Sequence, residues 1–261
     1  MKALKIYIYI FLLPWTVYQI ETNSICLQND VHALILARGG SKEIKYKNLV
    51  KIDGLSLLAR TILIIKKSSC FNYIWVSTDD HKIAIEAKKY GAIVHKRPVE
   101  YALDNTTSVA SVQEFLQSHQ SIHNFSLFQC TSVFLKTKYI KEAILKFQSF
   151  DCVFAVKRSH NLRWKIRETH ISPINFDIKS RPRRQDWEGE LIETGMFYFS
   201  TRKLVANGVL QNERCSYVEI KPKDSLEIDS KLDLKIARCI INKNKEKFVS
   251  FKNTENVIKS S

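Results

Sequence analysis

Apolar and polar residues follow two alternating periods along this chain of 261 residues. Short apolar runs typical of buried strands occupy residues 31–37, 73–76, 92–95, 125–129, 152–156, 191–199 and 217–220. Between them, apolar residues recur at helical spacing at 55–67, 82–90, 109–119, 138–147 and 232–242. Strands that alternate with helices predict an α/β fold with a doubly wound, mostly parallel sheet.

The alternation stops after residue 156 and resumes near residue 191. The intervening stretch holds Trp164, two prolines and a charged run that ends at Glu190. We therefore expect a lobe inserted at about residues 157–195 of a single domain that covers residues 25–250. A tail follows at 251–261, and no internal repeat or low-complexity linker divides the chain.

The first 24 residues have the pattern of a targeting segment. Two lysines precede an apolar run at residues 6–13, and small residues follow near residue 24. The run is short and Pro14 interrupts it, so we expect a signal peptide and no stable membrane span, with an uncleaved anchor as the alternative. This predicts the secretory pathway, with the Golgi as the favoured compartment. Glycosylation sequons at Asn105 and Asn124 fit that pathway.

Basic residues outnumber acidic ones by 41 to 26, which gives a formal charge of +15. Such a charge suits nucleic acid, an anionic membrane or a phosphorylated ligand. The chain has no zinc-finger spacing, and its one arginine-rich tract is residues 181–184. We therefore expect a basic surface around a polyanionic substrate and no nucleic-acid partner.

The six cysteines are scattered along the chain without paired metal-ligand spacing. This argues against a zinc site and against a compact disulfide framework. We expect each cysteine to be a buried thiol, with a single bridge left open as an alternative for a secreted chain.

The first apolar run opens into a turn that predicts a phosphate-binding loop. Its residues are Arg38, Gly39, Gly40, Ser41 and Lys42, followed by Lys47 and Asn48. Glycine lets backbone N–H groups approach a triphosphate, while the Arg38 and Lys47 cations donate charge-assisted hydrogen bonds and Asn48 reads a base or sugar edge. The glycine spacing matches neither the Walker loop nor the dinucleotide fingerprint. A surface turn with basic neighbours is the alternative.

Further polar residues follow predicted strands, where open α/β sheets bind their ligands. They are the cation Arg97, the amide and hydroxyl groups of Gln129 and Thr106, and the acids Glu227, Asp229 and Asp233. In an extended segment Glu227 and Asp229 point to one side, which predicts a Mg²⁺ clamp on phosphate oxygens. An acidic helix N-terminus is the alternative.

Several motifs together resemble the N-acylneuraminate cytidylyltransferases, the CMP-sialic acid synthetases. The residues that carry the resemblance are 36–42, 47–48, 75–79, 181–191 (Arg-Pro-Arg-Arg-Gln-Asp-Trp-Glu-Gly-Glu-Leu) and 228–229. The resemblance implies a Rossmann-like domain that joins CTP to sialic acid with Mg²⁺ and releases pyrophosphate. It also implies a homodimer or a dimer of dimers in which the inserted lobe pairs two subunits.

The resemblance also implies roles for individual residues. Arg38, Lys47 and Asn48 would hold the nucleotide, and Lys47 would also serve catalysis. Gln129, Arg97 and Thr106 would line the cytidine and sugar pockets, and Asp229 and Glu227 would take Mg²⁺. Arg183 would reach the reaction centre of the neighbouring subunit; a solvated basic loop is the alternative.

The chain departs from the family pattern at two places. Glu227 stands where the family has a second aspartate, and Glu43-Ile44-Lys45 replaces Gly-Ile-Pro, which removes a permissive and a rigid residue. Two other functions therefore stay open. One is a cytidylyltransferase for another 2-keto acid sugar, and the other is a catalytically weak relative that binds nucleotide or RNA.

Overall fold

The computed structural model describes residue 26 and residues 30–243. The predicted targeting segment at 1–24 and the predicted tail at 251–261 lie outside these residues. In the part of the chain that is described, no helix has both the length and the apolar character needed to cross a membrane.

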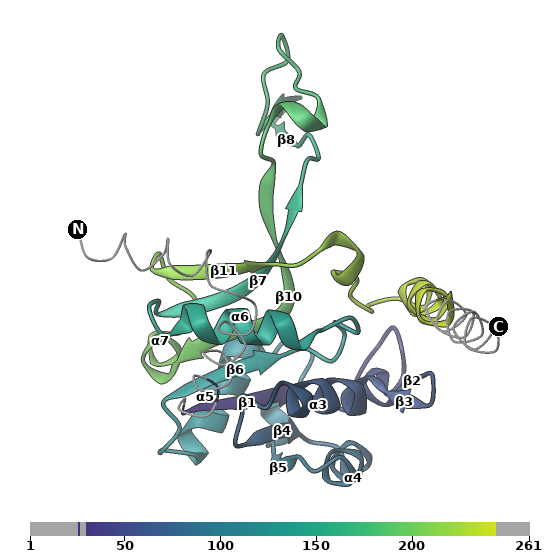
Figure 1. The fold of residues 1–261 in the computed structure, drawn as a ribbon, viewed down its shortest axis with the longest axis vertical. Coiled ribbons are helices and arrows are strands. Elements are labelled where there is room, and N and C mark those ends of the chain that lie inside the picture. The colour runs from purple at the N-terminus through teal and green to yellow at the C-terminus, as the bar shows by residue number, and fades with distance from the viewer. Residues whose placement is uncertain (1–25, 27–29, 244–261) are drawn as a thin grey trace, which may run out of the picture.

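Seven strands form one central sheet in the order β11-β7-β10-β6-β1-β4-β5 (Figure 1). The strands are β1 (Val31–Leu36), β4 (Ile74–Thr78), β5 (Ile93–Lys96), β6 (Asn124–Phe128), β7 (Cys152–Ser159), β10 (Glu190–Thr201) and β11 (Cys215–Glu219). Strands β6, β1, β4 and β5 are parallel, and β11 is parallel to β7. Only β10 runs antiparallel to both of its neighbours. The predicted mostly parallel α/β sheet is confirmed.

Successive side chains of a strand point to opposite faces of the sheet, so a strand that is apolar throughout makes both faces apolar. Helices cover each of these two faces. Ala33 and Ile35 of β1 join the larger apolar cluster, whereas Leu34 joins the smaller one. Helices α3 (Leu57–Ser68), α4 (His81–Lys89), α6 (Thr137–Phe147) and residues 231–243 supply the larger cluster. Helices α5 (Ser108–Ser118) and α7 (Arg202–Ala206) supply the smaller one.

Hydroxyl and carboxylate caps define where the helices begin. Ser56 accepts from the Ala59 N–H at the start of α3, and Asp80 accepts from the Ile83 N–H at the start of α4. The predicted start of α3 at Leu55 is wrong, because Leu55 pairs with Ile52 in the hairpin of β2 (Lys51–Ile52) and β3 (Leu55–Ser56).

A long two-stranded arm projects from the sheet (Figure 1). It consists of the outer parts of β7 and β10, the hairpin of β8 (Trp164–Arg167) and β9 (His170–Pro173), and η3 (Arg184–Asp186). These elements lie in the region for which the sequence predicts an inserted lobe. Strand β7 continues three residues beyond its predicted end because it pairs with β10 along the arm. The hairpin leaves Ile166 80% exposed and Ile171 59% exposed.

Two disulfide bonds correct the prediction of six buried thiols. Cys26 is bonded to Cys70, and Cys152 to Cys215. Of the remaining cysteines, Cys130 is a buried thiol as expected, and Cys239 is exposed. Sequence spacing does not reveal these pairs because the fold creates them: Cys152 and Cys215 lie opposite each other in the β7–β11 register.

Candidate functional site

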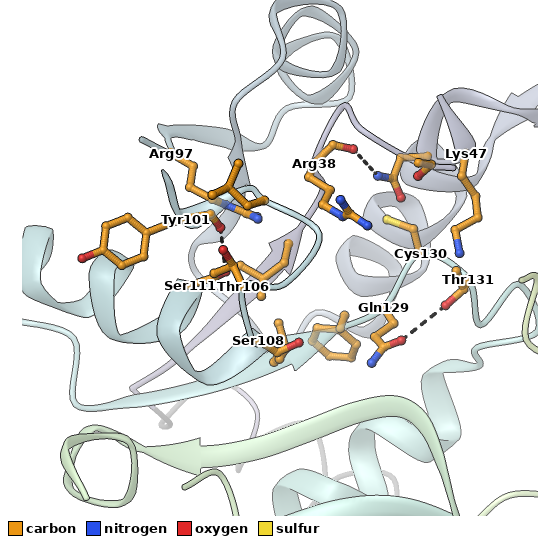
Figure 2. A pocket seen from close by; sticks show the side chains of 16 residues that line it. Arg38, Lys47, Arg97, Tyr101, Thr106, Ser108, Ser111, Gln129, Cys130 and Thr131 are labelled. Carbon is orange, nitrogen blue, oxygen red and sulfur yellow. Dashed lines mark hydrogen bonds between the residues drawn. The ribbon is translucent and has the colours of Figure 1, made fainter. Parts of the chain in front are cut away.

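A cavity of about 250 Å³ opens beyond the carboxyl ends of the parallel strands. Arg38 follows β1, Arg97 follows β5 and Gln129 follows β6, so the sheet brings them together. Seven of the residues singled out in the sequence line this cavity: Arg38, Ser41, Lys47, Asn48, Arg97, Thr106 and Gln129. Figure 2 shows Arg97 on one side, Lys47 on the other and Arg38 between them.

The turn after β1 is held by side chains from two other segments. Asn48 is buried, and its Nδ2 donates to the Arg38 carbonyl at 3.2 Å, which fixes the backbone beside the cavity. The Gly39 N–H donates to Asp79 Oδ1 at 2.9 Å, so this N–H is occupied within the protein. A Cβ on Gly39 would lie 2.9 Å from Asp80 Cβ, which explains the glycine by close packing. Gly40 lines a shallower depression beside the cavity.

Asp104 connects two cations of this turn, a contact that the sequence did not indicate. Its Oδ1 pairs with Arg38 Nη1, and its Oδ2 lies 2.7 Å from Lys42 Nζ. Hydrogen bonds from Lys42 and Arg38 lower the pKa of the Asp104 carboxyl. The exposed Asp104 carboxylate therefore lies between two basic side chains, in the place that an anionic ligand would take.

Arg97 is a buried cation at the wall of the cavity, with 4% of its surface exposed. Its Nε donates to Ser77 Oγ at 2.9 Å, and its Nη2 donates to the Ser77 carbonyl. Burial lowers the pKa of the guanidinium to about 10, while Asp79 and Glu114 oppose that shift, so Arg97 stays charged at neutral pH. Among the described residues the ion pairs do not include Arg97. A buried unpaired cation beside a cavity is suited to an anionic or strongly polar ligand.

Short-range contacts orient the remaining polar wall. Thr106 Oγ1 donates to the Glu100 carbonyl at 3.0 Å, which leaves the hydroxyl oxygen able to accept. Thr131 Oγ1 donates to Gln129 Oε1 at 3.4 Å. Sequence reasoning missed Tyr101, Ser108 and Ser111 as lining residues. Serine and threonine beside helix termini are common, so no distinctive sequence signal marked them.

The acid pair lies beside the cation Lys47. Lys47 Nζ is 3.0 Å from Asp229 Oδ1, and Glu227 Oε1 accepts from Ser132 Oγ at 3.0 Å. Burial raises the pKa of the Glu227 carboxyl, and the charge of Asp229 adds to the increase. Ile228 between the two acids is fully buried.

Close packing fixes the backbone next to Glu227. A Cβ on Gly195 would lie 2.7 Å from Glu227 Oε1, and Gly195 has φ +66°, a conformation that favours glycine. Any larger residue at position 195 would therefore displace the acid pair or the strand.

The donor set fits a magnesium ion that shares its coordination with substrate. Mg²⁺ is bound by one or two carboxylates together with phosphate oxygens and water, and does not need a cage made wholly of protein. The part of the chain that the structure describes holds no cluster of three or more His, Cys, Asp or Glu side chains placed for a metal. Asp229 and Glu227 are the pair of carboxylates beside Lys47, whereas Asp104 is paired with Arg38 and Lys42.

The third predicted acid, Asp233, has a different role. Its Oδ2 accepts from the Ser230 N–H at 2.7 Å and from the Asp229 N–H at 3.2 Å, so it caps the first turn of the helix at 231–243. The expectation that it belongs to the metal and nucleotide site is corrected for this residue.

Arg183 lies in the arm and does not line the cavity of its own chain. Its side chain is 75% exposed and forms two hydrogen bonds with Asp186, at 2.9 and 3.0 Å. The structure therefore brings together the other catalytic and substrate-binding candidates, but not Arg183.

Comparison with known proteins gives a consistent result. A family model described as Cytidylyltransferase matches residues 32–234. N-acylneuraminate cytidylyltransferase A of Danio rerio is 41% identical over 79% of this chain and 50% of its own length, and pseudaminic acid cytidylyltransferase of Campylobacter jejuni is 31% identical over 82% and 97%. The chain thus spans about half the length of the fish relative.

A solved structure shares the fold. CMP:2-keto-3-deoxy-manno-octonic acid synthetase in complex with CTP superposes with a TM-score of 0.64 at 14% identity, covering 83% of this chain and 100% of that one. At this identity the match supports the architecture of the sheet and its helices.

Proposed function

The chain belongs to the cytidylyltransferase family, and we propose that it transfers CMP from CTP to N-acetylneuraminate, giving CMP-sialic acid and pyrophosphate. The observation that carries this proposal is the cavity in which Arg38, Lys47 and the buried Arg97 converge beside the acids Glu227 and Asp229. Three cations suit a triphosphate and a sugar acid, and two carboxylates suit a metal that binds phosphate oxygens.

The reaction needs positioning and charge stabilisation more than covalent help from the protein. The anomeric hydroxyl oxygen of the sugar attacks the α-phosphorus of CTP, the bond to pyrophosphate breaks, and the hydroxyl proton passes to water. Arg38 and Lys47 hold the phosphates and stabilise the charge that develops on them. Inversion at phosphorus is the expected stereochemical result, because this route has no nucleotidyl-enzyme intermediate.

We assign the other lining residues to recognition. Asn48 keeps the turn after β1 in place, while Arg97, Thr106 and Gln129 line the pockets for cytidine and sugar. Asp229 and Glu227 would hold Mg²⁺, which when bound neutralises phosphate charge and orients the leaving pyrophosphate. Lys47, which contacts Asp229 here, would turn to the phosphates when CTP is bound.

The arm supports a homodimer as the active form. Its apolar residues Trp164, Ile166 and Ile171 are exposed, and burial against a second copy would remove them from water. In that assembly Arg183 leaves Asp186 and stabilises the transferring phosphoryl group or the sugar carboxylate in the neighbouring subunit.

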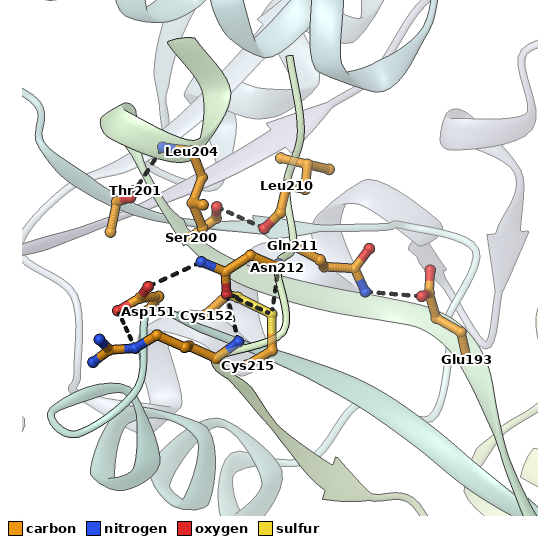
Figure 3. The surroundings of a disulfide bond; sticks show 11 residues. Asp151, Cys152, Glu193, Ser200, Thr201, Leu204, Leu210, Gln211, Asn212 and Cys215 are labelled. Atoms are coloured by element: carbon orange, nitrogen blue, oxygen red, sulfur yellow. Dashed lines mark hydrogen bonds and ion pairs between the residues drawn. A yellow bond between two sulfur atoms is a disulfide. The ribbon is translucent and has the colours of Figure 1, made fainter. Parts of the chain in front are cut away.

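Two disulfides support delivery to the secretory pathway, with the Golgi as the compartment. Figure 3 shows the bond between Cys152 and Cys215 beside Asn212, whose Nδ2 donates to Asp151 Oδ2 at 2.9 Å. The sequon at Asn105 lies in an exposed turn, which a glycan would tolerate. The sequon at Asn124 begins β6, where the next two side chains are buried, so we expect it to stay unmodified.

Transfer to another 2-keto acid sugar is the second candidate. The Campylobacter jejuni relative named for pseudaminic acid matches over nearly its whole length and favours this alternative. Glu227, with one more methylene than aspartate, and the Glu43-Ile44-Lys45 segment alter the region near the phosphates in either case.

The test is turnover of CTP with Mg²⁺ and each of three acceptors: N-acetylneuraminate, pseudaminic acid and 2-keto-3-deoxy-manno-octonate. CMP-sugar and pyrophosphate are both measured, with Arg38→Ala as the inactive control. We expect equal amounts of both products and the highest kcat/KM with N-acetylneuraminate. A higher value for another acceptor supports the second candidate, whereas no turnover combined with salt-dependent RNA binding contradicts both.

A further inference from the structure

The acid pair is delivered by a connector of irregular structure. Residues 220–229 link β11 to the helix at 231–243, and their only regular element is the short η4 (Pro222–Asp224). Such a segment has no ladder of hydrogen bonds to hold its position. The separation of Glu227 and Asp229 from the cavity is therefore set by isolated backbone hydrogen bonds, at Ile220 and Ile228, together with side-chain contacts.

Asp224 is the most constrained residue of this connector. It is 3% exposed, and Lys136 Nζ lies 2.7 Å from its Oδ1 and 2.6 Å from its Oδ2. Tyr139 Oη donates to its Oδ2 at 2.7 Å. Burial alone would raise the pKa of this carboxyl, but the donors Lys136 and Tyr139 hold it below its usual range.

Additional contacts continue this attachment toward the acids. The Lys221 N–H donates to Tyr139 Oη at 3.3 Å, and the Ile228 N–H donates to the Thr131 carbonyl at 3.0 Å. Ser132 Oγ donates to Glu227 Oε1 at 3.0 Å. The whole connector is thus fixed to the segment that runs from the end of β6 into α6, the same segment that supplies Gln129 and Thr131 to the cavity.

We propose that Asp224 is a positioning residue, which through Lys136 and Tyr139 sets the distance of the acid pair from the phosphate-binding side of the cavity. The proposal rests on the metal role assigned to Asp229 and Glu227 above. A carboxylate held by two charge-assisted hydrogen bonds and a phenol is fixed in direction as well as distance, whereas apolar packing alone would let the connector slide. Partners hydrogen-bonded to metal ligands commonly change metal affinity 10- to 100-fold; Asp224 lies one step further back, three residues before Glu227, so an effect at the low end of this range is expected.

The experiment measures Mn²⁺ binding to the full chain with CTP present, by the electron paramagnetic resonance signal of free Mn²⁺. Asp224→Asn keeps the volume of the side chain but removes its charge, and we expect the Mn²⁺ dissociation constant to rise about 10-fold. CTP affinity in EDTA should change less than about 2-fold, because the cations of the phosphate side are untouched. Tyr139→Phe removes one hydroxyl and should weaken Mn²⁺ binding about 3-fold. This second variant tests the proposal if Asp224→Asn folds poorly.

Glu219→Gln is the matched control, since it breaks the ion pair between Arg158 of β7 and Glu219, the last residue of β11, directly before the connector. It should leave Mn²⁺ binding unchanged. If Asp229→Ala abolishes Mn²⁺ binding while Asp224→Asn and Tyr139→Phe leave it intact, the positioning role is wrong and the metal site stands. If Asp229→Ala does not alter Mn²⁺ binding, the metal assignment fails and this inference fails with it. Equal weakening by Glu219→Gln would reduce Asp224 to a general structural role and also contradict the proposal.

Discussion

The body of the sheet and the arm place arginine in opposite environments. Arg97 of the body is 4% exposed and held by Ser77, whereas the side chain of Arg183 in the arm is 75% exposed and, within the described part of the chain, forms an ion pair with Asp186 alone. The apolar residues differ in the same way: Ile35 of β1 is fully buried, and Ile166 of β8 is 80% exposed. The body therefore encloses its functional side chains, whereas the arm leaves comparable side chains exposed, and the proposed dimer would cover them.

The strongest test of this contrast separates turnover from nucleotide binding. Arg183→Ala should lower kcat about 1,000-fold, the size of effect typical of an arginine that acts across an interface, and leave the CTP dissociation constant within about 2-fold. Arg184→Ala is the control in the same turn. In an equal mixture with Arg38→Ala, heterodimers should restore about a quarter of wild-type activity, because half of the dimers have one intact site. Heterodimers that form but stay inactive would contradict action in trans.

Acidic residues introduced on the exposed apolar surface of the arm should dissociate the dimer without unfolding the body. The double variant Ile166→Glu/Ile171→Glu should raise the dimer dissociation constant at least about 30-fold, as expected for buried interface residues. The melting temperature of the dissociated subunit should stay close to that of wild-type monomer. Analytical ultracentrifugation measures the dimer dissociation constant, with Ile85→Glu at an exposed position of α4 as the control. An unchanged dimer would show that another surface joins the subunits.

Releasing a cation from its ion pair should change the affinity for CTP in the body and not in the arm. Asp104→Asn frees Arg38 and Lys42 from an exposed ion pair, so CTP should bind about 2- to 5-fold more tightly. Asp186→Asn frees Arg183 in the same sense and should leave CTP affinity unchanged. Calorimetric titration with CTP compares the two variants. Weaker binding by Asp104→Asn would indicate that Asp104 itself orders the turn for the nucleotide.

The smallest predicted difference concerns acid stability. The folded-state pKa values of Asp224 and Asp186 both lie below the unfolded value, so any stabilisation is present above about pH 4 and is lost as the pH falls through the folded pKa. Asp224 is buried, and Asp224→Asn should lower the free energy of unfolding at pH 7 and flatten its decline below pH 4. Asp186→Asn should change neither, because water screens its pair. Urea unfolding from pH 3 to 7 measures both, and a flattened profile for Asp186→Asn would contradict this difference.

The sequence predicted the body of the fold well because most strands there contain a short apolar run, such as Val31–Leu36 of β1. Helix α6 was expected at 138–147 and spans Thr137–Phe147. The arm was harder to predict, since β8 is exposed along its length and its pattern resembles a loop. The short α7 and the β2–β3 hairpin contain too few residues for either period to be recognised.

The predicted cavity residues lie close together for one physical reason, which can be recognised from the sequence. Carboxyl ends of parallel strands meet at one edge, so Arg38, Arg97 and Gln129 had to lie close together. The ion pairs of Asp104 with Lys42 and of Asp224 with Lys136 were not predicted. Loop conformation brings these residues together, and hydrophobic periodicity does not reveal loop conformation. The same reason explains Asp233, whose carboxylate turned back to cap its own helix.

Strand β10 belongs to both regions at once. Its first residues, Glu190 to Glu193, pair along the arm, and Tyr198 and Phe199 pair again with β7 in the body after an irregular stretch. Gly195 lies in that stretch, tightly packed against Gln129 and Glu227. The strand that forms one side of the arm therefore continues into the backbone that packs against Gln129 and Glu227. We therefore expect insertions or deletions in the arm to shift the backbone at Gly195 and, through it, the Glu227 carboxylate.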